Sequence, residues 1–349
     1  MAILQVIGVI LGLSLLAAVL LPLIRSEAWW IRVFDFPRLQ VAFLLAIVLA
    51  ASVALFDATQ LPALLFLLAL GMALVYQLWR IYPYTPLASP QVIRKSGEAA
   101  SRVRLLTANV LMDNRRADDF VALVRENAPD LIMIAETDDW WDTQLAKLDC
   151  DYPFSIKHPL GNTYGMHLFS KLELRDPTLQ FLVDDDVPSV YAAIRLRSGV
   201  WFDFYGVHPT PPRPRQDTEE RDAELLVVGK TVKRNGRPAI VAGDLNDVAW
   251  SRSTNLFQKI SGLIDPRIGR GLFSTFHAGY PGLRWPLDHV FHSREFTLVQ
   301  MRRLRSFGSD HFPMLVELCY SPTAMPLQEA PQADGDDREE AADKIAQAR

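Results

Sequence analysis

The chain has 349 residues, half of them hydrophobic, and its formal net charge is −4. A slightly acidic chain has no overall positive field to attract nucleic acid, so the composition does not favour a nucleic-acid-binding protein. Two cysteines, Cys150 and Cys319, are too few for a disulfide framework or a cysteine metal cluster. We expect two buried apolar thiols, and one disulfide between them is the alternative.

Three apolar stretches lie before residue 80, at residues 2–24, about 40–56 and about 61–79. Roughly 20 apolar residues are enough to cross a bilayer, and core helices of soluble proteins rarely run so long without a charge. A cleaved signal peptide is the alternative for the first stretch, but no Lys or Arg follows Met1 closely. We therefore expect residues 1–80 to form a multi-pass membrane domain of three transmembrane helices in contact with the lipid bilayer.

The charges beside these stretches favour one orientation. The loop between the first and second stretches carries Arg25, Arg32 and Arg38, whereas the next loop carries Asp57 and no Lys or Arg. Arg80 directly follows the third stretch. By the positive-inside rule, the first loop and everything after residue 80 face the cytoplasm. Large domains can be translocated regardless of charge, so an extracytoplasmic catalytic domain is the alternative.

The remaining chain divides by composition into three parts. Residues 81–101 are rich in Pro, Ser and Ala and are expected to form a linker. Residues 102–320 alternate short apolar runs with amphipathic stretches, which is typical of a globular domain. Residues 321–349 are rich in Ala, Asp, Glu, Gln and Pro, and we expect a disordered tail, with a short helix at its end as the alternative.

Within the globular part, apolar runs outnumber helical patterns. Helices are expected at 117–127 and 215–233. Strands are expected at 102–107, 131–135, 166–169, 190–197, 201–207, 239–242, 286–292 and 314–318. Neither a regular βαβ repeat nor a meander fits this order, so two packed sheets with outer helices are expected.

Polar groups lie at six sites, five beside upstream strands and the sixth just before the last strand. They are Asn109, Glu136, His208, the pair Asp244 and Asn246, Asp288, and the pair Asp310 and His311. Any one of them could be a helix cap or a turn former. Strand ends meet at one rim of a sheet, and four carboxylates gathered there would repel one another unless a cation shared the site. Oxygen ligands favour Mg²⁺ or Mn²⁺, which indicates phosphoester or phosphoanhydride chemistry.

Seven motifs carry a resemblance to a known family. They are LLTANV, PDLIMIAET, YGMHLFSK, FYGVHPTPP, VAGDLND, PLDHVFHS and SDHFPMLVEL. In this order they make residues 103–318 resemble the endonuclease/exonuclease/phosphatase superfamily, which is DNase I-like. The resemblance implies an α/β fold, a four-layered αββα sandwich preceded here by three transmembrane helices, and a divalent-metal-dependent phosphohydrolase. The domain order is similar to that of membrane-anchored bacterial members, which implies a bacterial inner or cell membrane.

The resemblance also implies which residues bind the metal ion. Glu136 matches the principal metal ligand of the family, and Asn109 matches the amide beside it that contacts metal or phosphate. Asp310 matches a second ligand, or an acid that lies behind the ligands. The implied cofactor is Mg²⁺ or Mn²⁺.

The implied catalytic residues are Asp244, Asn246, His311, Asp288 and His208. Asp244 resembles the carboxylate that positions or deprotonates the attacking water, and Asn246 resembles its companion that binds phosphoryl oxygens. His311 resembles the catalytic histidine, and Asp288 the acid that orients it. His208 falls where the family places a residue facing the scissile phosphate.

Two arginines and two further histidines carry weaker signals. Arg213 and Arg215 follow His208 after a proline-rich turn and are candidates for binding substrate phosphate, with a solvated face as the alternative. His289 is expected to be structural, because side chains alternate along a strand and its neighbour Asp288 should face the site. The role of His167 is left open.

The sequence favours a membrane-anchored phosphohydrolase that cleaves a phosphodiester, phosphomonoester or pyrophosphate, with a lipid-linked substrate preferred. The alternative is a membrane-tethered endonuclease or exonuclease acting on DNA or RNA, although the slightly acidic domain lacks the basic track that such an enzyme needs. A receptor or scaffold that kept the fold without its activity is the third possibility.

Overall fold

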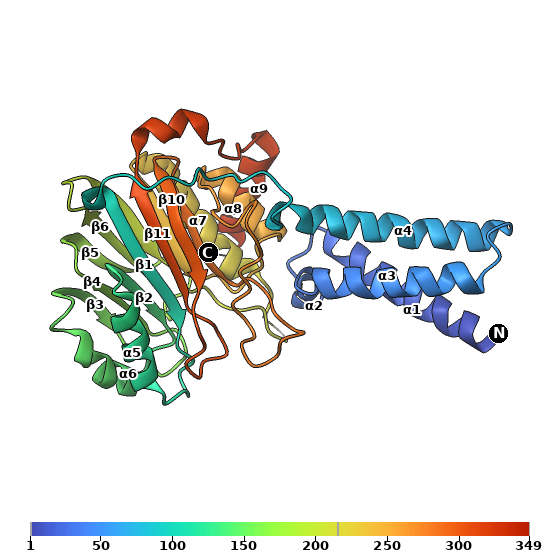
Figure 1. Ribbon diagram of the computed structural model, residues 1–349, viewed down its shortest axis with the longest axis horizontal. Helices are drawn as coiled ribbons and strands as arrows, with labels where there is room; N and C mark the ends of the chain where they lie inside the picture. Colours follow the sequence, from blue (N-terminus) through green and yellow to red (C-terminus); the bar gives the residue numbers. More distant parts are fainter. Residues whose placement is uncertain (1, 215, 349) are drawn as a thin grey trace.

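The computed structural model describes residues 2–214 and 216–348, which form a bundle of apolar helices and an α/β domain (Figure 1). The bundle contains α1 (Ala2–Leu20), α3 (Arg38–Leu55) and α4 (Leu61–Ile81). Three spans, Ala2–Leu23, Arg38–Leu55 and Leu61–Tyr84, are long and apolar enough to cross a membrane, as the sequence predicts. Leu45 and Leu70 are buried between the helices, whereas large apolar side chains such as Leu65 and Val75 are exposed on the outside.

The segment between α1 and α3 folds into short helices at the end of the bundle that meets the α/β domain. These are η1 (Leu21–Leu23), α2 (Trp29–Arg32) and η2 (Val33–Asp35). Asp35 is buried and pairs with Arg38 at 2.6 Å and with Arg32 at 3.4 Å. The N-terminus lies at the opposite end of the bundle (Figure 1). The basic first loop and the α/β domain therefore lie at the same end of the helices.

Two mixed sheets form the centre of the α/β domain. In the first sheet the strand order is β10-β11-β1-β2-β4-β3, and in the second it is β5-β6-β7-β8-β9. The first sheet contains β1 (Arg102–Asn109), β2 (Leu131–Ala135), β3 (Phe154–His158), β4 (Met166–Ser170), β10 (Phe296–Arg303) and β11 (Met314–Tyr320). The second contains β5 (Leu174–Phe181), β6 (Pro188–Arg195), β7 (Trp201–Gly206), β8 (Ala239–Asp244) and β9 (Asp288–His292). The pairs β1–β2 and β7–β8 are parallel, and the other pairs are antiparallel.

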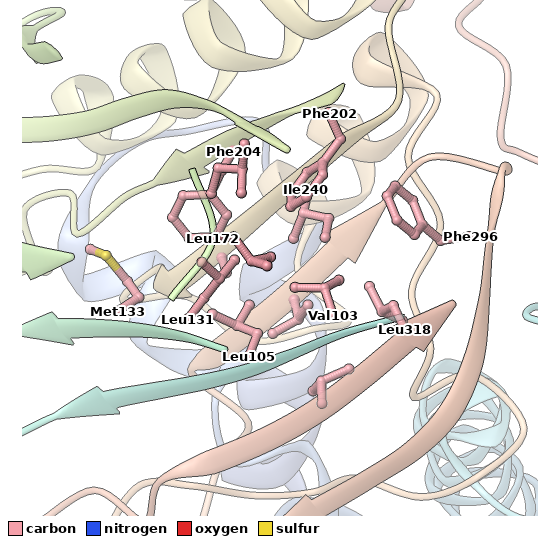
Figure 2. Close-up of a cluster of buried hydrophobic side chains, with 14 of the residues drawn as sticks. Val103, Leu105, Leu131, Met133, Leu172, Phe202, Phe204, Ile240, Phe296 and Leu318 are labelled. Carbon is pink, nitrogen blue, oxygen red and sulfur yellow. The ribbon is translucent and has the colours of Figure 1, made fainter. Parts of the chain in front are cut away.

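Helices cover the outer face of each sheet, so the domain has four layers. The first sheet packs against α5 (Ala117–Asn127) and α6 (Asp139–Leu145) through side chains such as Phe120 and Trp141. The second packs against α7 (Glu219–Asn235) and α8 (Arg252–Ser261). Figure 2 shows the core between the sheets, where Leu131 and Met133 of β2 lie opposite Phe204 and Ile240. The expected α/β, DNase I-like αββα sandwich is confirmed.

Three strands and three helices were not expected from the sequence, and a fourth helix, α9, was expected only as an alternative. The strands β3, β5 and β10 all lie at sheet edges. An edge strand is partly solvated and carries fewer apolar residues: β5 is largely exposed and contains Pro177. The helices α2, α6 and α8 are short, and α9 lies in the tail. Helix α7 begins at Glu219, four residues after the expected start at 215.

The tail after residue 320 is folded for most of its length, as in the alternative of a short helix at its end and not as in the expected disordered tail. It contains η6 (Pro322–Leu327) and α9 (Gly335–Gln347), which is capped by Asp334 through a capping box with Asp337. Ala341 of α9 is buried in a small apolar cluster beside α7 and α8. The Nζ atom of Lys344 lies 3.0 Å from Oδ2 of Asp222 in α7. A few tertiary contacts fix a segment whose composition alone indicates disorder.

The expected linker is also packed against the domain. It contains η3 (Tyr82–Tyr84) and η4 (Ala99–Ser101). Val92 between them is fully buried in the core between the two sheets. Both cysteines are free: Cys319 is buried, as expected, whereas Cys150 is exposed.

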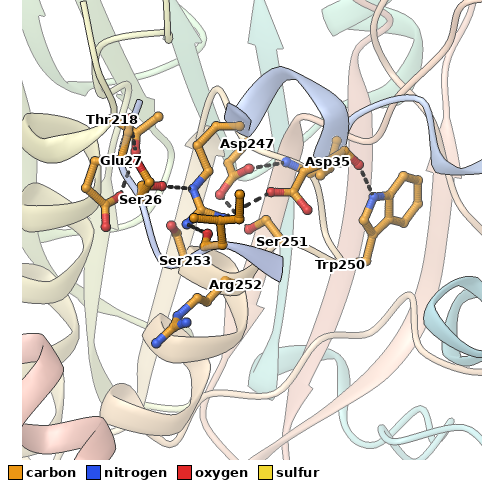
Figure 3. A network of polar contacts seen from close by, with 12 residues as sticks. Ser26, Glu27, Asp35, Thr218, Asp247, Trp250, Ser251, Arg252 and Ser253 are labelled. Atoms are coloured by element: carbon orange, nitrogen blue, oxygen red, sulfur yellow. Dashed lines mark hydrogen bonds and ion pairs between the residues drawn. The ribbon is translucent and has the colours of Figure 1, made fainter. Parts of the chain in front are cut away.

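Hydrogen bonds tie the first loop of the bundle to the α/β domain (Figure 3). The indole Nε1 of Trp250 donates to the carbonyl oxygen of Asp35 at 2.7 Å, and Thr218 Oγ1 donates to Glu27 Oε2 at 2.9 Å. The Glu27 carboxylate also pairs with Lys344 of the tail. The helical bundle is therefore attached to the domain by side-chain contacts in addition to the covalent connection.

One buried carboxyl in α7 gives a stability prediction. Burial raises the pKa of Glu224 to about 8 from its usual 4.5, and a hydrogen bond from Ser189 opposes that rise only in part. A carboxyl with a raised pKa holds its proton in the folded state at pH values where the unfolded state has lost it. Its contribution to stability is therefore complete below pH 4.5 and is lost as the pH rises towards 8.

We expect Glu224→Gln to raise the Tm of the full chain in detergent by about 3 °C at pH 8 and by less at pH 5. Thermal denaturation at both pH values measures the difference. Glu173→Gln, which changes an exposed glutamate paired with Arg195, is the control and should leave both Tm values close to wild type. An equal gain for Glu224→Gln at the two pH values would contradict a buried titrating carboxyl.

Candidate active site

The polar groups expected at strand ends meet at one rim of the sandwich. Parallel pairing of β1 with β2 places Asn109 opposite Ala135, so that Glu136 follows beside it. In the second sheet, Asp244 of β8 pairs with Asp288 of β9. His311 lies just before β11, the strand that pairs with β1. Both sheets therefore contribute side chains to the same place.

Asn109 holds the two halves of this rim together. Its Nδ2 donates to Glu136 Oε1 at 2.7 Å and to Asp244 Oδ2 at 3.1 Å. Its Oδ1 accepts from the backbone N–H of Leu111 at 2.9 Å, which fixes the orientation of the amide. One buried amide thus joins a carboxylate of the first sheet to a carboxylate of the second.

His311 is buried between two carboxylates. Its Nδ1 donates to Asp288 Oδ2 at 2.8 Å, and its Nε2 lies 3.5 Å from Asp244 Oδ2. Burial alone would lower the pKa of His311, but the charges of Asp244 and Asp288 and the hydrogen bond from Nδ1 outweigh it and raise the pKa to about 10. Because Asp288 holds Nδ1, Nε2 is the ring atom that points towards Asp244.

His208 and Asn246 flank Asp244. His208 Nε2 lies 3.9 Å from Asp244 Oδ2, and its Nδ1 is buried without a hydrogen-bond partner within the described residues. The backbone N–H of Asn246 donates to Asp244 Oδ1 at 3.0 Å, and the Asn246 side chain donates to the carbonyl of Pro209 at 2.9 Å. Asp244 therefore lies at the centre of a group formed by Asn109, Asn246, His208 and His311.

The backbone of Glu136 is held in the left-handed region, with φ at 64°. The next residue, Thr137, donates its backbone N–H to the carbonyl of Gly165 at 3.1 Å. Its hydroxyl lies 2.8 Å from His167 Nδ1, and His167 Nε2 donates to Asp142 at 2.8 Å. Burial lowers the pKa of His167, which matches a neutral ring in this position. The open question about His167 is answered by position: it supports the turn that carries Glu136.

Local sequence patterns do not indicate these supporting residues. Thr137 and Gly165 are common turn residues, and the two segments are brought together only by the pairing of β2 with β4. A Cβ atom on Gly165 would lie 1.8 Å from the carbonyl oxygen of Thr137, so only glycine fits there.

Asp310 and the two arginines lie less centrally. Asp310 is half-buried and accepts a long hydrogen bond of 3.4 Å from Ser309, whose hydroxyl also donates to the carbonyl of Asn109. No hydrogen bond joins Asp310 to Glu136 within residues 2–214 and 216–348. Arg213 is exposed, and Arg215 lies outside the described residues.

His289 and Arg267 are buried next to the site and have structural contacts. His289 Nδ1 accepts from Arg267 at 2.6 Å, and its Nε2 donates to the carbonyl of Asp247 at 2.9 Å. Both ring nitrogens are thus occupied by scaffold groups. The side chain takes the structural place expected for it.

The donor set at the rim suits a hard cation better than a soft one. Glu136 and Asp244 provide carboxylate oxygen atoms, Asn109 turns its Nδ2 towards both of them, and no thiolate is among the rim residues. The described residues contain no group of three or more His, Cys, Asp and Glu side chains arranged for a metal ion. Mg²⁺ usually keeps several waters and binds only one or two carboxylates, so the Glu136 carboxylate is a sufficient protein contribution.

Comparisons with known proteins agree with this fold. The model of the endonuclease/exonuclease/phosphatase family matches residues 106–311, which is more than half of the chain. An endonuclease/exonuclease/phosphatase from Bacteroides vulgatus superposes with a TM-score of 0.53 at 18% identity, over 63% of this chain and 99% of that one. The human Nocturnin catalytic domain with bound sulfate superposes with a TM-score of 0.53 at 16% identity, over 63% of this chain and 94% of that one. Humanized Danio rerio TDP2 superposes with a TM-score of 0.52 at 16% identity, over 62% of this chain and 99% of that one.

A curated relative, a UPF0294 protein of Vibrio campbellii, is 33% identical over 101 residues. That match spans 28% of this chain and 34% of the relative. Members of the matched family hydrolyse phosphate esters and generally use divalent metal ions. Together with the two mixed sheets and their shared rim of carboxylates, amides and histidines, the match over residues 106–311 shows that the chain belongs to the endonuclease/exonuclease/phosphatase family.

Proposed function

We propose that the protein is a membrane-anchored, divalent-metal-dependent phosphohydrolase that cleaves a phosphodiester, phosphomonoester or pyrophosphate, with a lipid-linked substrate preferred. The observation that carries the proposal is the joined set of Glu136, Asn109 and Asp244 next to the His311–Asp288 pair. The three apolar helices support the anchor, because each is long enough to cross a bilayer.

Each rim residue has a role in this proposal. Glu136 and Asn109, with Asp310 behind them, would hold Mg²⁺ or Mn²⁺, and the bound ion supplies positive charge for the phosphoryl oxygens. Asp244 accepts a proton from, or positions, the attacking water. His311 presents Nε2 to the phosphoryl group because Asp288 fixes its Nδ1.

His208 and the amide of Asn246 lie on the other side of Asp244 and would contact the remaining phosphoryl oxygens. Arg213 would attract substrate at the exposed rim, with Arg215 beside it in sequence. A largely buried set of this kind is already in place before substrate arrives, which is the condition for electrostatic stabilisation of a transition state.

The protein is proposed to be a multi-pass protein of a bacterial inner or cell membrane, with its α/β domain on the cytoplasmic side. Arg25 and Arg80 lie at the end of the bundle where the domain lies and support this orientation. Arg32 and Arg38 form buried ion pairs with Asp35 and therefore have a structural role. Their charges are weaker evidence for the orientation in the membrane. The extracytoplasmic orientation is the alternative.

A membrane-tethered nuclease is the second candidate. A structure of Danio rerio TDP2 with a single-stranded DNA product shares this fold with a TM-score of 0.52. The net charge of −4 argues against extended contact with a nucleic-acid backbone. Substrate selectivity of the purified chain separates the two candidates.

We expect the full chain in detergent to release phosphate from lipid-linked phosphates in the presence of Mg²⁺ and to lose that activity in EDTA. Glu136→Gln and His311→Ala should each lower kcat by roughly 100-fold or more, because one removes a charged metal ligand and the other the group facing the phosphate. Inorganic phosphate release from nucleotides and polyprenyl pyrophosphates, together with chromatography of the products from DNA and phospholipids, whose phosphodiesters free no phosphate when cleaved, measures both effects. Glu173→Gln, far from the rim, is the control. Activity that survives EDTA would overturn the metal requirement, and turnover of DNA alone would favour the nuclease.

We expect Gly165→Ala to lower activity by about 10-fold or more, because the added methyl would push against Thr137 and displace the neighbouring Glu136. Gly161→Ala is the matched control, since no atom lies within 4 Å of the Cβ it would add. Phosphate release at saturating Mg²⁺ and the Tm of both variants are the measurements. Equal activity of the two variants would show that the turn does not position Glu136.

A further inference from the structure

An open groove of about 1030 Å³ lies where the bundle meets the active-site loops. One wall is the first part of α3, with Leu39, Phe43 and Leu44, and the opposite wall includes Phe273. Figure 1 shows the loop after α8 extending from the domain towards these helices. Gln40 Nε2 donates to the carbonyl of Gly282 at 2.9 Å, so the two walls are in direct contact. The groove is therefore built jointly from a candidate membrane helix and a loop of the α/β domain.

Two arginines, Arg284 and Arg303, lie in the otherwise largely apolar lining of this groove. Both guanidinium groups lie over the ring of Phe312, at 5.0 Å and 4.3 Å from its centroid. In the described part of the chain their hydrogen bonds go only to main-chain carbonyl oxygens. The two cations thus share one aromatic ring, with no carboxylate pairing with them in that part. Burial, followed by repulsion from Arg284, lowers the pKa of Arg303.

The groove lies next to the proposed catalytic histidine. Phe312 directly follows His311. The ring of Phe276 lies 5.0 Å from the His311 ring and is stacked on Trp285 at 6.0 Å. The ring centroids of Trp285 and Phe36 are in turn 6.0 Å apart. Phe36 lies just before Pro37, at the start of α3. A row of rings therefore leads from the end of the bundle to the catalytic rim.

We propose that this groove binds a lipid phosphate, with the anionic head at Arg284 and Arg303 and the first part of the apolar chain along α3. The paired arginines complement a phosphate or pyrophosphate, which guanidinium groups bind with several N–H donors. The apolar wall complements the chain: Leu39, Phe43 and Leu44 are 45%, 67% and 47% exposed. A soluble phosphate gives no reason for such a wall. Since α3 itself is long enough to cross a bilayer, a lipid could enter the groove along the helix without leaving an apolar surface.

This inference rests on the proposed function for the hydrolysis that would follow, but the binding step can be tested alone. The probes are a non-hydrolysable polyprenyl phosphonate and its butyl counterpart, added to the full chain in lipid nanodiscs. We expect the long-chain phosphonate to bind at least ~10-fold more tightly, because each buried methylene adds favourable transfer free energy.

Variants of the two walls separate the contribution of the anionic head to binding from that of the apolar chain. Arg284→Met with Arg303→Met should weaken binding of both phosphonates by about 10-fold or more. Phe43→Ala with Leu44→Ala should reduce the preference for the long chain and leave the butyl affinity close to wild type. Arg302→Met is the control for the arginines, since Arg302 lies on the same strand and donates instead to Asn127 at 3.1 Å. Leu65→Ala, on the exposed face of α4, is the control for the apolar wall.

The proposal is overturned if the wild type binds both phosphonates equally, or if Arg302→Met weakens binding as much as the paired arginine variants. Tm values and elution profiles in detergent show whether each variant is folded. Absence of hydrolysis of every substrate by the wild type would overturn the proposed function, whereas the binding data would still decide whether the groove binds a lipid phosphate.

Discussion

The amide nitrogen of Asn109 is the point on which the candidate site depends, because it bonds to one carboxylate from each sheet. A buried carboxylate without a donor is costly, so the two sheets must keep the spacing at which one amide reaches both. The core sets that spacing. A Cβ atom on Gly206 of β7 would lie 2.6 Å from Met133 of β2, which shows how closely the sheets approach below the rim. Packing between the sheets is thus also a condition for the geometry of the site.

The strands end at this rim in conformations that ordinary residues rarely adopt. Glu136 and Asn246 have φ values of 64° and 51°, and Gly243 has 145°. Such backbone persists only where the surroundings hold it, and here hydrogen bonds do so. Thr137 is held by Gly165, and the carbonyl of Asn246 accepts from Arg221 at 3.0 Å. These turns direct side chains from the strand ends into the space between the sheets.

The sequence predicted those parts of the structure that local pattern determines. Central strands are continuous apolar runs, and each ends in the residue that reaches the rim, so Asn109, Glu136, Asp244 and His311 could be found from the strands themselves. Edge strands such as β5 lack that pattern, and α9 is held by contacts made far away in the chain. The support of Glu136 by His167 and the approach of Arg284 to Arg303 are likewise tertiary facts that no local spacing records.

The contacts between the bundle and the domain make the bundle more than a tether. A tether needs only the covalent connection through residues 81–101, yet Trp250 donates to the carbonyl of Asp35 and Thr218 donates to Glu27 at 2.9 Å. Phe36 reaches, through Trp285 and Phe276, the ring of His311. Removing the bundle would therefore expose one end of this row of rings and take away one wall of the groove. The helices and the α/β domain together form the surroundings of His311, so both parts of the chain contribute to the environment of the proposed catalytic residue.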